Sequence, residues 1–427
     1  MERRLAADPE DADGRSRLAA VKVLIVGSGA REHALAWKLG SGGGVDELHA
    51  APGNPGIAAL GECHPVRAED GEGLLSLCRE LGIDLVVVGP EAPLVAGLVD
   101  TLRRGGVAAF GPTRAAARIE GSKTFAKDVL EAAGVPTARR LSVARPPCVV
   151  KADGLAAGKG VFVCRTQEEL DAALRAAAGL GGDVLIEELL EGEEVSLFAI
   201  TDGTRAVALA PAQDFKRIGE GDTGPNTGGM GSYSPVPGLG DPEVEELLDT
   251  VHRPVLAELA RRDTPFSGLL YAGLMLTEDG PRVLEFNCRF GDPETQSILP
   301  RLESDLLPLL WGAATGELQG EALLGDGAAV TVVLAGGGYP ERSDSGTPIE
   351  GVREAEATGA LAFHAGTAMR EGQLVTHGGR VLALTATGGD VAAARAAAYE
   401  AAGRVSFAGM RFRRDIALAA AEGHVRS

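Results

Sequence analysis

The sequence lacks any apolar run of the roughly 18 residues that a membrane-spanning helix needs, so no such helix is expected. Residues 1–20 also lack the apolar centre of a signal peptide, and we expect them to form a disordered extension. Positive charge is scarce, since the formal net charge is −19 at pH 7. That balance argues against nonspecific binding to nucleic acid or to an anionic membrane surface. We therefore expect neither nucleic acid nor a membrane as a partner.

Cysteine is sparse and scattered along the chain. There are five cysteines, an odd number, and no Cys-x-x-Cys pair. Histidines and cysteines show no zinc-binding spacing either, so neither a disulfide framework nor a zinc site is expected. A reducing cytoplasm is the simplest location for such a chain. The sequence also offers no Ser/His/Asp or Cys/His arrangement of the kind that covalent catalysis uses.

The length of 427 residues is enough for several domains with substantial cores. We assign residues 21–121 to an N-terminal α/β domain with a parallel sheet, because short apolar runs there end in glycine or proline. Residues 122–325 are expected to form a second domain, with a small lid subdomain at about 125–190. Residues 326–427 have the pattern of a smaller α+β domain. The expected fold class is therefore α/β and α+β, multidomain. The turn-rich stretch 205–235 is expected to be a long functional loop.

A glycine-rich turn follows the first apolar run. Gly27-Ser28-Gly29 separates an expected strand from an expected helix, and such a helix N-terminus can hold a phosphate. The dinucleotide fingerprint Gly-x-Gly-x-x-Gly is incomplete, because Glu32 stands where its third glycine belongs. The second expected strand is also not followed by a ribose-binding acid, which disfavours NAD. A phosphate site of another kind and a tight turn without a ligand both remain open.

The segment from Lys151 to Val161, KADGLAAGKGV, is the most informative part of the chain. It lies between two short apolar runs, which predicts a strand, a glycine-rich turn and a second strand. Its glycines let the backbone approach a ligand, and its lysines add positive charge, so the turn can fold over a polyphosphate. These residues are Lys151, Gly154, Gly158, Lys159 and Gly160. It is not a P-loop, because a strand follows it and the Gly-Lys-Ser/Thr ending is missing.

Glu285 and Asn287 stand two residues apart in the expected strand VLEFN. Side chains at positions i and i+2 share one face of a strand. Two neighbouring oxygen ligands suit a hard cation such as Mg²⁺ bound to phosphates. This pair therefore predicts a metal site beside the lysine- and glycine-rich turn.

Two further charged segments have both a functional and a plain interpretation. Glu187 and Glu188 form an adenosine pocket together with Glu194, or they belong to a solvated hairpin tip. Arg289 offers a planar fork for a carboxylate or a phosphoryl group, or it forms a structural ion pair with Asp292 or Glu294. Local sequence alone leaves both alternatives open.

Taken together, these motifs resemble the phosphoribosylamine–glycine ligases (glycinamide ribonucleotide synthetases) of the ATP-grasp superfamily, from about Val21 to the C-terminus. The motifs that carry the resemblance are 27–34 (GSGAREHA), 51–56 (APGNPG), 88–94 (VGPEAPL), 110–112 (FGP), 120–123 (EGSK), 151–160 (KADGLAAGKG), 224–231 (GPNTGGMG), 285–296 (EFNCRFGDPETQ) and 364–367 (HAGT). The resemblance implies a pre-ATP-grasp N-terminal domain, an ATP-grasp domain with a lid, and a C-terminal domain. Ala30 and Phe215 depart from the family pattern, where a glycine and a histidine are usual.

The resemblance implies a set of site residues, carried over motif by motif. The nucleotide-binding residues would be Lys123, Lys151, Gly154, Gly158, Lys159, Gly160, Glu187, Glu188, Leu190 and Glu194. The residues that bind the other substrates would be Gly27, Gly29, Arg31, Glu32, Asn54, Gly89, Pro90, Glu91, Lys216, Gly229 and Asp292. The metal ligands would be Glu285 and Asn287, and the catalytic residues would be Lys151, Arg289 and Asp214.

The resemblance also implies a reaction: ATP, glycine and 5-phosphoribosylamine give ADP, phosphate and glycinamide ribonucleotide, through glycyl phosphate, with Mg²⁺ or Mn²⁺. A monomer is expected. Three alternatives remain: another ATP-grasp ligase or carboxylase, a non-catalytic nucleotide sensor, and an NAD-dependent oxidoreductase. The N-terminal motifs disfavour the first, and the intact set of Lys151, Arg289, Glu285 and Asn287 disfavours the second. The third would show an absorbance change at the nicotinamide band.

Overall fold

The computed structural model describes residues 21–154 and 160–423. The extension expected at residues 1–20, and the predicted nucleotide contacts of Gly158 and Lys159, lie outside these described residues. No helix in the described part of the chain is long and apolar enough to cross a membrane.

The N-terminal domain is built on the parallel sheet that the sequence predicts. Its strands are β1 (Val21–Gly27), β2 (Val45–Pro52), β3 (Glu62–Cys63), β4 (Leu85–Val88) and β5 (Ala108–Phe110), in the order β3-β2-β1-β4-β5. The helices between and after them are α1 (Ala30–Gly40), α2 (Gly71–Leu81), α3 (Glu91–Ala96), α4 (Leu98–Arg104) and α5 (Arg114–Gly121). The central strands are apolar on both faces because helices cover both faces, as usual for parallel sheets. The strand order reverses between β1 and β4, so a crevice is expected at their carboxyl ends.

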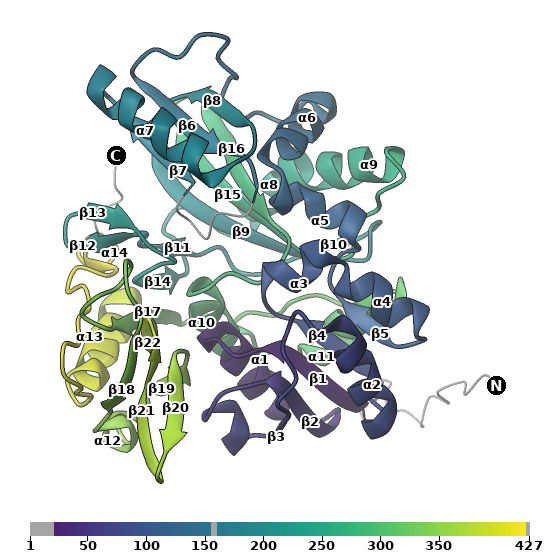
Figure 1. The fold of residues 1–427 in the computed structure, drawn as a ribbon, viewed down its shortest axis with the longest axis vertical. Helices are drawn as coiled ribbons and strands as arrows, with labels where there is room; N and C mark the ends of the chain where they lie inside the picture. The colour runs from purple at the N-terminus through teal and green to yellow at the C-terminus, as the bar shows by residue number, and fades with distance from the viewer. Residues whose placement is uncertain (1–20, 155–159, 424–427) are drawn as a thin grey trace.

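The middle of the chain begins with helix α6 (Lys123–Ala133) and forms two further sheets. A three-stranded sheet contains β6 (Cys148–Ala152), β7 (Val161–Cys164) and β8 (Val184–Glu188), with helix α7 (Gln167–Leu180) packed against it at the top of Figure 1. The predicted strand–turn–strand is confirmed, since β6 and β7 are antiparallel neighbours. A four-stranded sheet has the order β10-β9-β15-β16, with strands β9 (Glu193–Thr201), β10 (Ala206–Ala208), β15 (Gly268–Thr277) and β16 (Gly280–Asn287).

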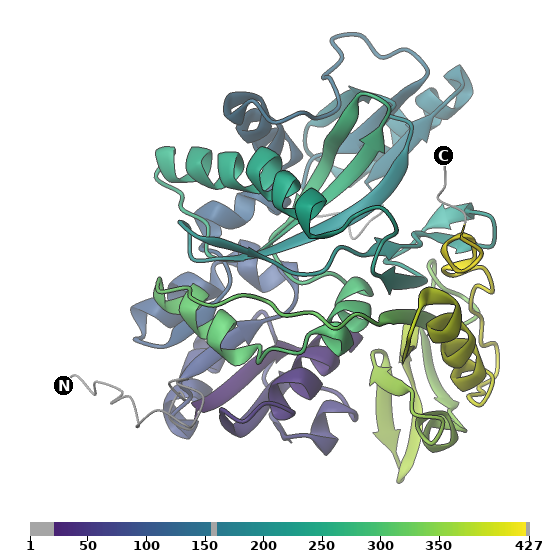
Figure 2. The ribbon, with the colours of Figure 1, turned by 180° about the vertical axis from the view of Figure 1, so that it is seen from behind.

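One face of the four-stranded sheet is covered by a continuous helical segment. It comprises α8 (Asp241–Leu247), a π-helical turn (Leu248–His252) and α9 (Arg253–Arg261), seen from behind in Figure 2. After β16 the chain forms α10 (Glu294–Ile298), a short 3-10 turn (Leu299–Arg301) and α11 (Leu307–Thr315). A further 3-10 turn spans Ile57–Ala59 in the N-terminal domain.

The C-terminal part contains a five-stranded sheet of order β11-β14-β17-β22-β19. Its strands are β11 (Gln213–Asp214), β14 (Gly231–Ser234), β17 (Ala328–Ala335), β19 (Leu361–His364) and β22 (Arg380–Gly388). The expectation that 205–235 is one structureless loop is therefore wrong. Two strands from it extend the C-terminal sheet, while β12 (Arg217–Gly219) and β13 (Thr223–Asn226) pair with each other. The domain limits placed at 122 and 326 remain a prediction.

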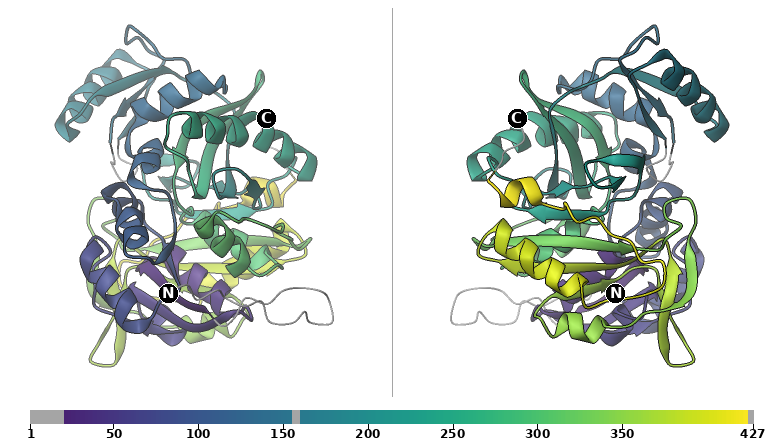
Figure 3. Two further views of the ribbon diagram at one scale, coloured as in Figure 1. Left: turned by 90° about the vertical axis from the view of Figure 1, so that its right-hand side faces the viewer. Right: turned by 90° about the vertical axis from the view of Figure 1, so that its left-hand side faces the viewer.

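The remaining elements cover this sheet. Helix α13 (Val391–Ala402) packs on β17 and β22, as the right-hand view in Figure 3 shows. A small sheet of order β18-β21-β20 contains β18 (Asp344–Pro348), β20 (Thr367–Arg370) and β21 (Gln373–Gly378). Helices α12 (Val352–Glu356) and α14 (Leu418–Ala421) complete the described chain.

Candidate active site

A cavity of about 520 Å³ opens between the three-stranded sheet and the domains below it. This volume suits a nucleotide-sized ligand. The charged residues that line it are Arg31, Glu91, Glu120, Lys123, Lys127, Lys151, Glu187, Asp214, Lys216, Glu285, Arg289, Asp292, Glu294 and Arg380. They come from all three expected domains, so the site exists only in the folded chain.

Two lysines share one buried carboxylate at the upper side of the cavity. The Nζ atom of Lys151 lies 2.6 Å from Oε2 of Glu187. The other oxygen of Glu187 pairs with Nζ of Lys127. Lys151 also donates to the carbonyl of Leu284 at 2.8 Å, which joins β6 to β16. The three side chains together carry a net charge of about +1, which favours an anionic ligand.

Asp153 anchors the base of the glycine-rich turn to helix α6. One of its oxygens accepts from the backbone N–H of Lys123 at 2.6 Å and from that of Gly154 at 3.0 Å. The other accepts from the Ser122 hydroxyl at 3.1 Å. The Lys123 ammonium donates to the Gly154 carbonyl at 3.2 Å, so it lies directly beside the turn. The two lysines predicted to contact ATP therefore lie at one end of one cavity.

Glu285 and Asn287 lie on β16 and both line the cavity, as their spacing predicts. Within the described residues, neither side chain is engaged in a hydrogen bond or an ion pair. Both are half-buried and offer oxygen atoms, the donors that Mg²⁺ and Mn²⁺ prefer. The pair therefore fits a hard divalent ion next to the two lysines.

The opposite end of the cavity is lined by paired arginines. Arg289 lies 3.3 Å from Glu91 and 3.4 Å from Glu120. The ion pair of Arg289 with Asp292 or Glu294, which the sequence suggested, is therefore wrong in its partners. Asp292 instead pairs with Arg380 at 2.7 Å. Burial lowers the pKa of Arg289, but Glu120 and then Glu91 raise it, with a net rise above the usual value. Arg289 therefore remains a cation under all physiological conditions.

A second charged group surrounds Lys216. Its Nζ atom lies 2.6 Å from Glu194 and 2.7 Å from Asp214. Burial acts to lower the pKa of Lys216, yet Asp214 and Glu194 hold it well above its usual value. Burial, and then the Asp214 carboxylate, raise the pKa of Glu294 to about 7. A carboxyl group with this pKa can exchange a proton at neutral pH.

The Gly27-Ser28-Gly29 turn is closed by a side chain of the protein itself. The carboxylate of Glu32 accepts from the backbone N–H of Gly29 at 2.5 Å and from Nε of Arg31 at 2.6 Å. A Cβ atom on Gly27 would lie 2.7 Å from Glu32, and one on Gly89 only 2.0 Å from it. These glycines therefore leave room for the Glu32 carboxylate at the ends of β1 and β4. The Glu32 carboxylate thus contacts the N–H group at the start of this helix, and whether a substrate also binds here stays a prediction.

The cavity brings together only part of the predicted set. Within the described chain, the predicted residues that do not line it are Gly27, Gly29, Glu32, Asn54, Gly89, Glu188, Leu190, Glu194 and Gly229. Asn54 donates to the carbonyls of Ser28 and His364, and Glu188 accepts from the backbone of Arg139. The binding roles of these residues remain predictions.

Several cavity residues were not predicted. Those with polar or charged side chains include Lys127, Glu120, Thr137, Tyr271, Glu294 and Arg380. Lys127 could have been found, because it follows Lys123 by one helical turn and so shares its face. Arg380 gave no such signal, since it reaches the site from β22.

Comparisons with known proteins identify the family. Three profiles match in sequence: the N domain of phosphoribosylglycinamide synthetase at 21–120, its ATP-grasp (A) domain at 121–295, and its C domain at 329–419. The phosphoribosylamine–glycine ligase of Streptomyces coelicolor is 51% identical over 94% of this chain and 100% of its own length. That of Mycobacterium tuberculosis is 50% identical over 95% and 100%.

Solved structures agree in fold. The crystal structure of phosphoribosylamine–glycine ligase from Thermotoga maritima has a TM-score of 0.82 and 35% identity, covering 93% of this chain and 100% of that one. The biotin carboxylase domain of the Hydrogenobacter thermophilus 2-oxoglutarate carboxylase, at 17% identity and a TM-score of 0.67, shares the fold alone. The expected three-part architecture, with an N-terminal parallel sheet, an ATP-grasp domain and a C-terminal domain, is thereby confirmed. The chain belongs to the phosphoribosylglycinamide synthetase family, whose members in these comparisons are ATP-grasp ligases.

Proposed function

We propose that this chain joins glycine to 5-phosphoribosylamine, with ATP as the energy source, and releases glycinamide ribonucleotide, ADP and phosphate. The reaction class, ATP-dependent carbon–nitrogen ligation, follows from family membership over nearly the whole chain. The observation that supports the site is the cavity in which Lys151 and Lys123 lie close to Glu285 and Asn287. Cations, oxygen ligands and a glycine-rich turn at one end of a cavity are what a nucleoside triphosphate needs.

In this proposal the upper end of the cavity binds ATP. Lys151 is fixed by Glu187 and by the Leu284 carbonyl, so its ammonium is held in place before the nucleotide arrives. Such prior positioning removes the cost of ordering a long side chain during the reaction. Mg²⁺ or Mn²⁺ held by Glu285 and Asn287 would neutralise charge on the β- and γ-phosphates. Apolar residues on α6, among them Ala126 and Leu130, leave room for the base.

The opposite end of the cavity would bind glycine and 5-phosphoribosylamine. The glycine carboxylate is a poor electrophile, so one of its oxygens first attacks the γ-phosphorus and ADP leaves. Arg289 is placed to stabilise the negative charge on the transferred group, because its guanidinium lines the cavity and stays protonated. The product of this step, glycyl phosphate, carries phosphate as a good leaving group.

The second step forms the carbon–nitrogen bond. The amine of 5-phosphoribosylamine attacks the acyl carbon, phosphate leaves with the electrons of the C–O bond, and the new amide nitrogen loses a proton. Glu294 is placed to accept that proton, because it is buried, lines the cavity and has a pKa of about 7. No protein nucleophile takes part. Exclusion of water from the cavity would protect the acyl phosphate from hydrolysis.

The test is ADP release with ATP and Mg²⁺, with glycine or 5-phosphoribosylamine omitted in turn. We expect turnover only when both are present, with glycinamide ribonucleotide identified by mass. ADP release that depends on a different acid or amine would keep the ATP-grasp ligase and overturn this choice of substrates. Release that needs neither would overturn the ligation itself.

The role of Glu294 has its own test. The variant Glu294→Gln keeps the shape of the side chain but cannot accept a proton. We expect kcat to fall about 100-fold, and the inflection near pH 7 in its pH profile to disappear. A profile that keeps this inflection would assign the proton transfer to another group.

The surroundings of the enzyme complete the proposal. We infer that it acts as a monomer in the cytoplasm, on small molecules and without nucleic acid or membrane partners. The cytoplasmic location rests on the five free cysteines, and the absence of nucleic acid and membrane partners rests on the net charge of −19. Size-exclusion chromatography with light scattering would test the monomer, and a dimer mass at micromolar concentration would contradict it.

A further inference from the structure

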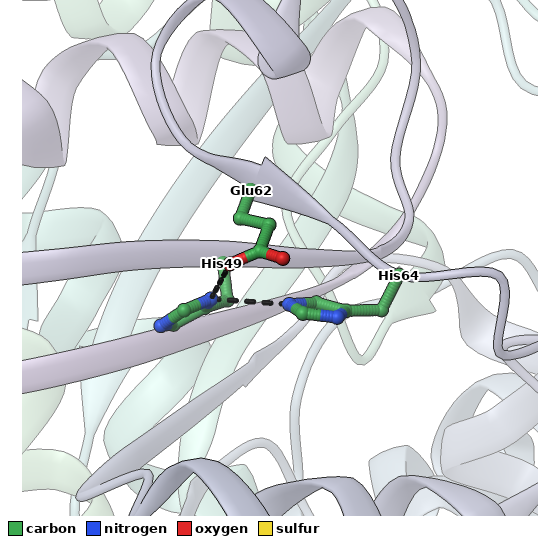
Figure 4. Close-up of side chains that lie close together, drawn as sticks. All are labelled: His49, Glu62 and His64. Carbon is green, nitrogen blue, oxygen red and sulfur yellow. Dashed lines mark hydrogen bonds and ion pairs between the residues drawn. The ribbon is translucent and has the colours of Figure 1, made fainter.

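Three potential metal ligands meet at the edge of the N-terminal sheet, outside the cavity described above. His49 lies on β2, Glu62 lies on β3, and His64 follows β3 directly. One ligand atom from each lies within 4.8 Å of the others. Figure 4 shows the three side chains pointing toward one another. The spacing of histidines in the sequence did not predict a zinc site here. His49 and His64 are 15 residues apart, and only the pairing of β2 with β3 brings them together.

The tautomer of His49 is set on its far side. Its Nε2 atom lies 3.3 Å from Oε2 of Glu47, a carboxylate that can only accept a hydrogen bond. Nε2 therefore carries the proton, and Nδ1 presents a lone pair on the other side of the ring. A carboxylate that orients a histidine in this way is the usual outer partner of a metal-binding imidazole.

The lone pair of His49 faces the other two ligands. Nδ1 lies 3.1 Å from Nε2 of His64 and 4.0 Å from Oε2 of Glu62. Two imidazole nitrogens bound to one tetrahedral zinc ion are about 3.3 Å apart, given Zn–N distances of about 2.0–2.1 Å. The Glu62 side chain is 70% exposed, so it can move the short distance that an ion would require. The rings are tilted by 41° rather than stacked, which lets both nitrogens face one point.

We propose that His49, Glu62 and His64 form a three-ligand site for a zinc-class divalent ion, with water in the fourth position. Imidazole and carboxylate ligands at these separations suit Zn²⁺, Co²⁺ or Ni²⁺ better than Mg²⁺, which prefers oxygen ligands alone. The competing arrangement is a simple hydrogen bond between the two histidines, with a proton in the place of the ion. The proposal does not depend on the ligase activity.

A bound ion would stabilise the segment between β2 and β3. This segment contains Asn54, whose side chain donates to the carbonyl of Ser28 at 2.9 Å and to that of His364 at 2.8 Å. Asn54 thus joins the closed Gly27–Gly29 turn to the C-terminal sheet. A metal that joins His49 to His64 would hold both ends of the segment and raise the thermal stability of the N-terminal domain.

The experiment is Zn²⁺ titration by calorimetry of the full chain, stripped of metal and kept in excess Mg²⁺. We expect one strong site per chain, lost in His64→Gln and in His49→Gln, and weakened about 10- to 100-fold in Glu47→Gln. His377→Gln, a change at an exposed histidine, is the matched control and should bind as the wild type does. Glu285→Ala should also keep the site, which separates it from the proposed active-site metal. Equal Zn²⁺ affinity in the wild type and in His64→Gln would overturn the proposal.

Two further measurements identify the metal ligands and the effect of the ion on thermal stability. Co²⁺ in place of Zn²⁺ should give visible bands of a tetrahedral nitrogen and oxygen site, without a thiolate band. Cys63 is expected on the opposite face from Glu62, because successive side chains of a strand alternate, so a thiolate band would overturn the ligand set. Zn²⁺ should raise the midpoint of thermal unfolding by roughly 5 °C in the wild type and leave that of His64→Gln unchanged. An equal rise in both would contradict the link to these residues.

Discussion

Two glycine-rich turns in this chain look alike in sequence and differ in what lies against them. Each follows a short apolar strand, β1 or β6, and each has a charged side chain close by. In the Gly27–Gly29 turn, the carboxylate of Glu32 fills the space and accepts from the backbone. At the Lys151 turn, the carboxylate of Glu187 pairs with both Lys127 and Lys151. The two lysines also line the cavity, so together with Glu187 they give it a net positive charge. A glycine-rich turn therefore allows another group to approach the backbone closely. The charges beside the turn decide whether that group is a side chain of the protein or a ligand.

The largest expected effect comes from the oxygen ligands that line the cavity near Lys151. The variant Glu285→Ala removes one of the two predicted metal ligands, and we expect kcat to fall by about 1,000-fold or more while the fold stays intact. Turnover at increasing Mg²⁺ concentration measures the loss of kcat, and a circular dichroism spectrum shows whether the fold is intact. Glu278→Ala, on the exposed end of the same hairpin, should behave as the wild type. Near-normal turnover of Glu285→Ala at ordinary Mg²⁺ would remove Glu285 from the metal site.

The next effect concerns Glu187, the carboxylate that pairs with Lys127 and Lys151. In Glu187→Gln, Lys127 and Lys151 lose their shared counter-charge in a buried place. We expect the free energy of unfolding to fall by about 3–5 kcal/mol and the KM for ATP to rise about 10- to 100-fold. Urea unfolding and steady-state kinetics measure these changes. The control Glu191→Gln, at an exposed position nearby, should change neither. An unchanged KM would mean that Lys151 is not positioned through Glu187.

The lysine- and glycine-rich segment 151–161 was predictable because its parts are close in sequence. A strand, three glycines and two lysines follow one another within 151–161, and Glu285 and Asn287 share a strand face by simple alternation. The end of the cavity that contains Arg289 and Arg380 was less predictable, because its contacts join segments that are distant in sequence. Arg289 pairs with Glu91 across 198 positions, and Arg380 pairs with Asp292 across 88. Local sequence shows that an arginine needs a partner, and only the packed domains decide which carboxylate it meets.

A change at the Gly27–Gly29 turn should lower stability without weakening the binding of ATP. Glu32→Gln keeps the size of the side chain but replaces charge-assisted hydrogen bonds to Gly29 and Arg31 with neutral ones. We expect the free energy of unfolding to fall by about 1–3 kcal/mol, with a KM for ATP within about 2-fold of the wild type. Glu72→Gln, also an acid in the first turn of a helix but exposed, is the control. A large rise in the KM for ATP would show that this turn also serves the nucleotide.

The last prediction concerns the pH dependence of stability near the Gly27–Gly29 turn, and it involves no change in turnover. Helix α1, which begins at this turn, carries His33, whose Nδ1 accepts from the backbone N–H of His364 at 2.9 Å. Burial first, and then the neighbouring His364, lower the pKa of His33 to about 3, and burial lowers that of His364 to about 4. Both imidazoles are therefore neutral when folded and take up protons near pH 6.5 when unfolded.

The sign follows from proton uptake. Between about pH 6.5 and pH 4 the unfolded chain binds more protons than the folded one, so the free energy of unfolding falls as the pH falls, by about 1.4 kcal/mol per pH unit for each histidine. Above pH 6.5 this contribution is fully present. In His33→Asn the amide oxygen can replace Nδ1 as an acceptor and does not titrate, so the slope should fall by the share of one histidine, about 1.4 kcal/mol per pH unit, with turnover at pH 8 unchanged. Urea unfolding from pH 4 to pH 8, with His377→Asn as the exposed control, measures the slope. An equal slope in His33→Asn and the wild type would mean that acid acts on groups other than His33.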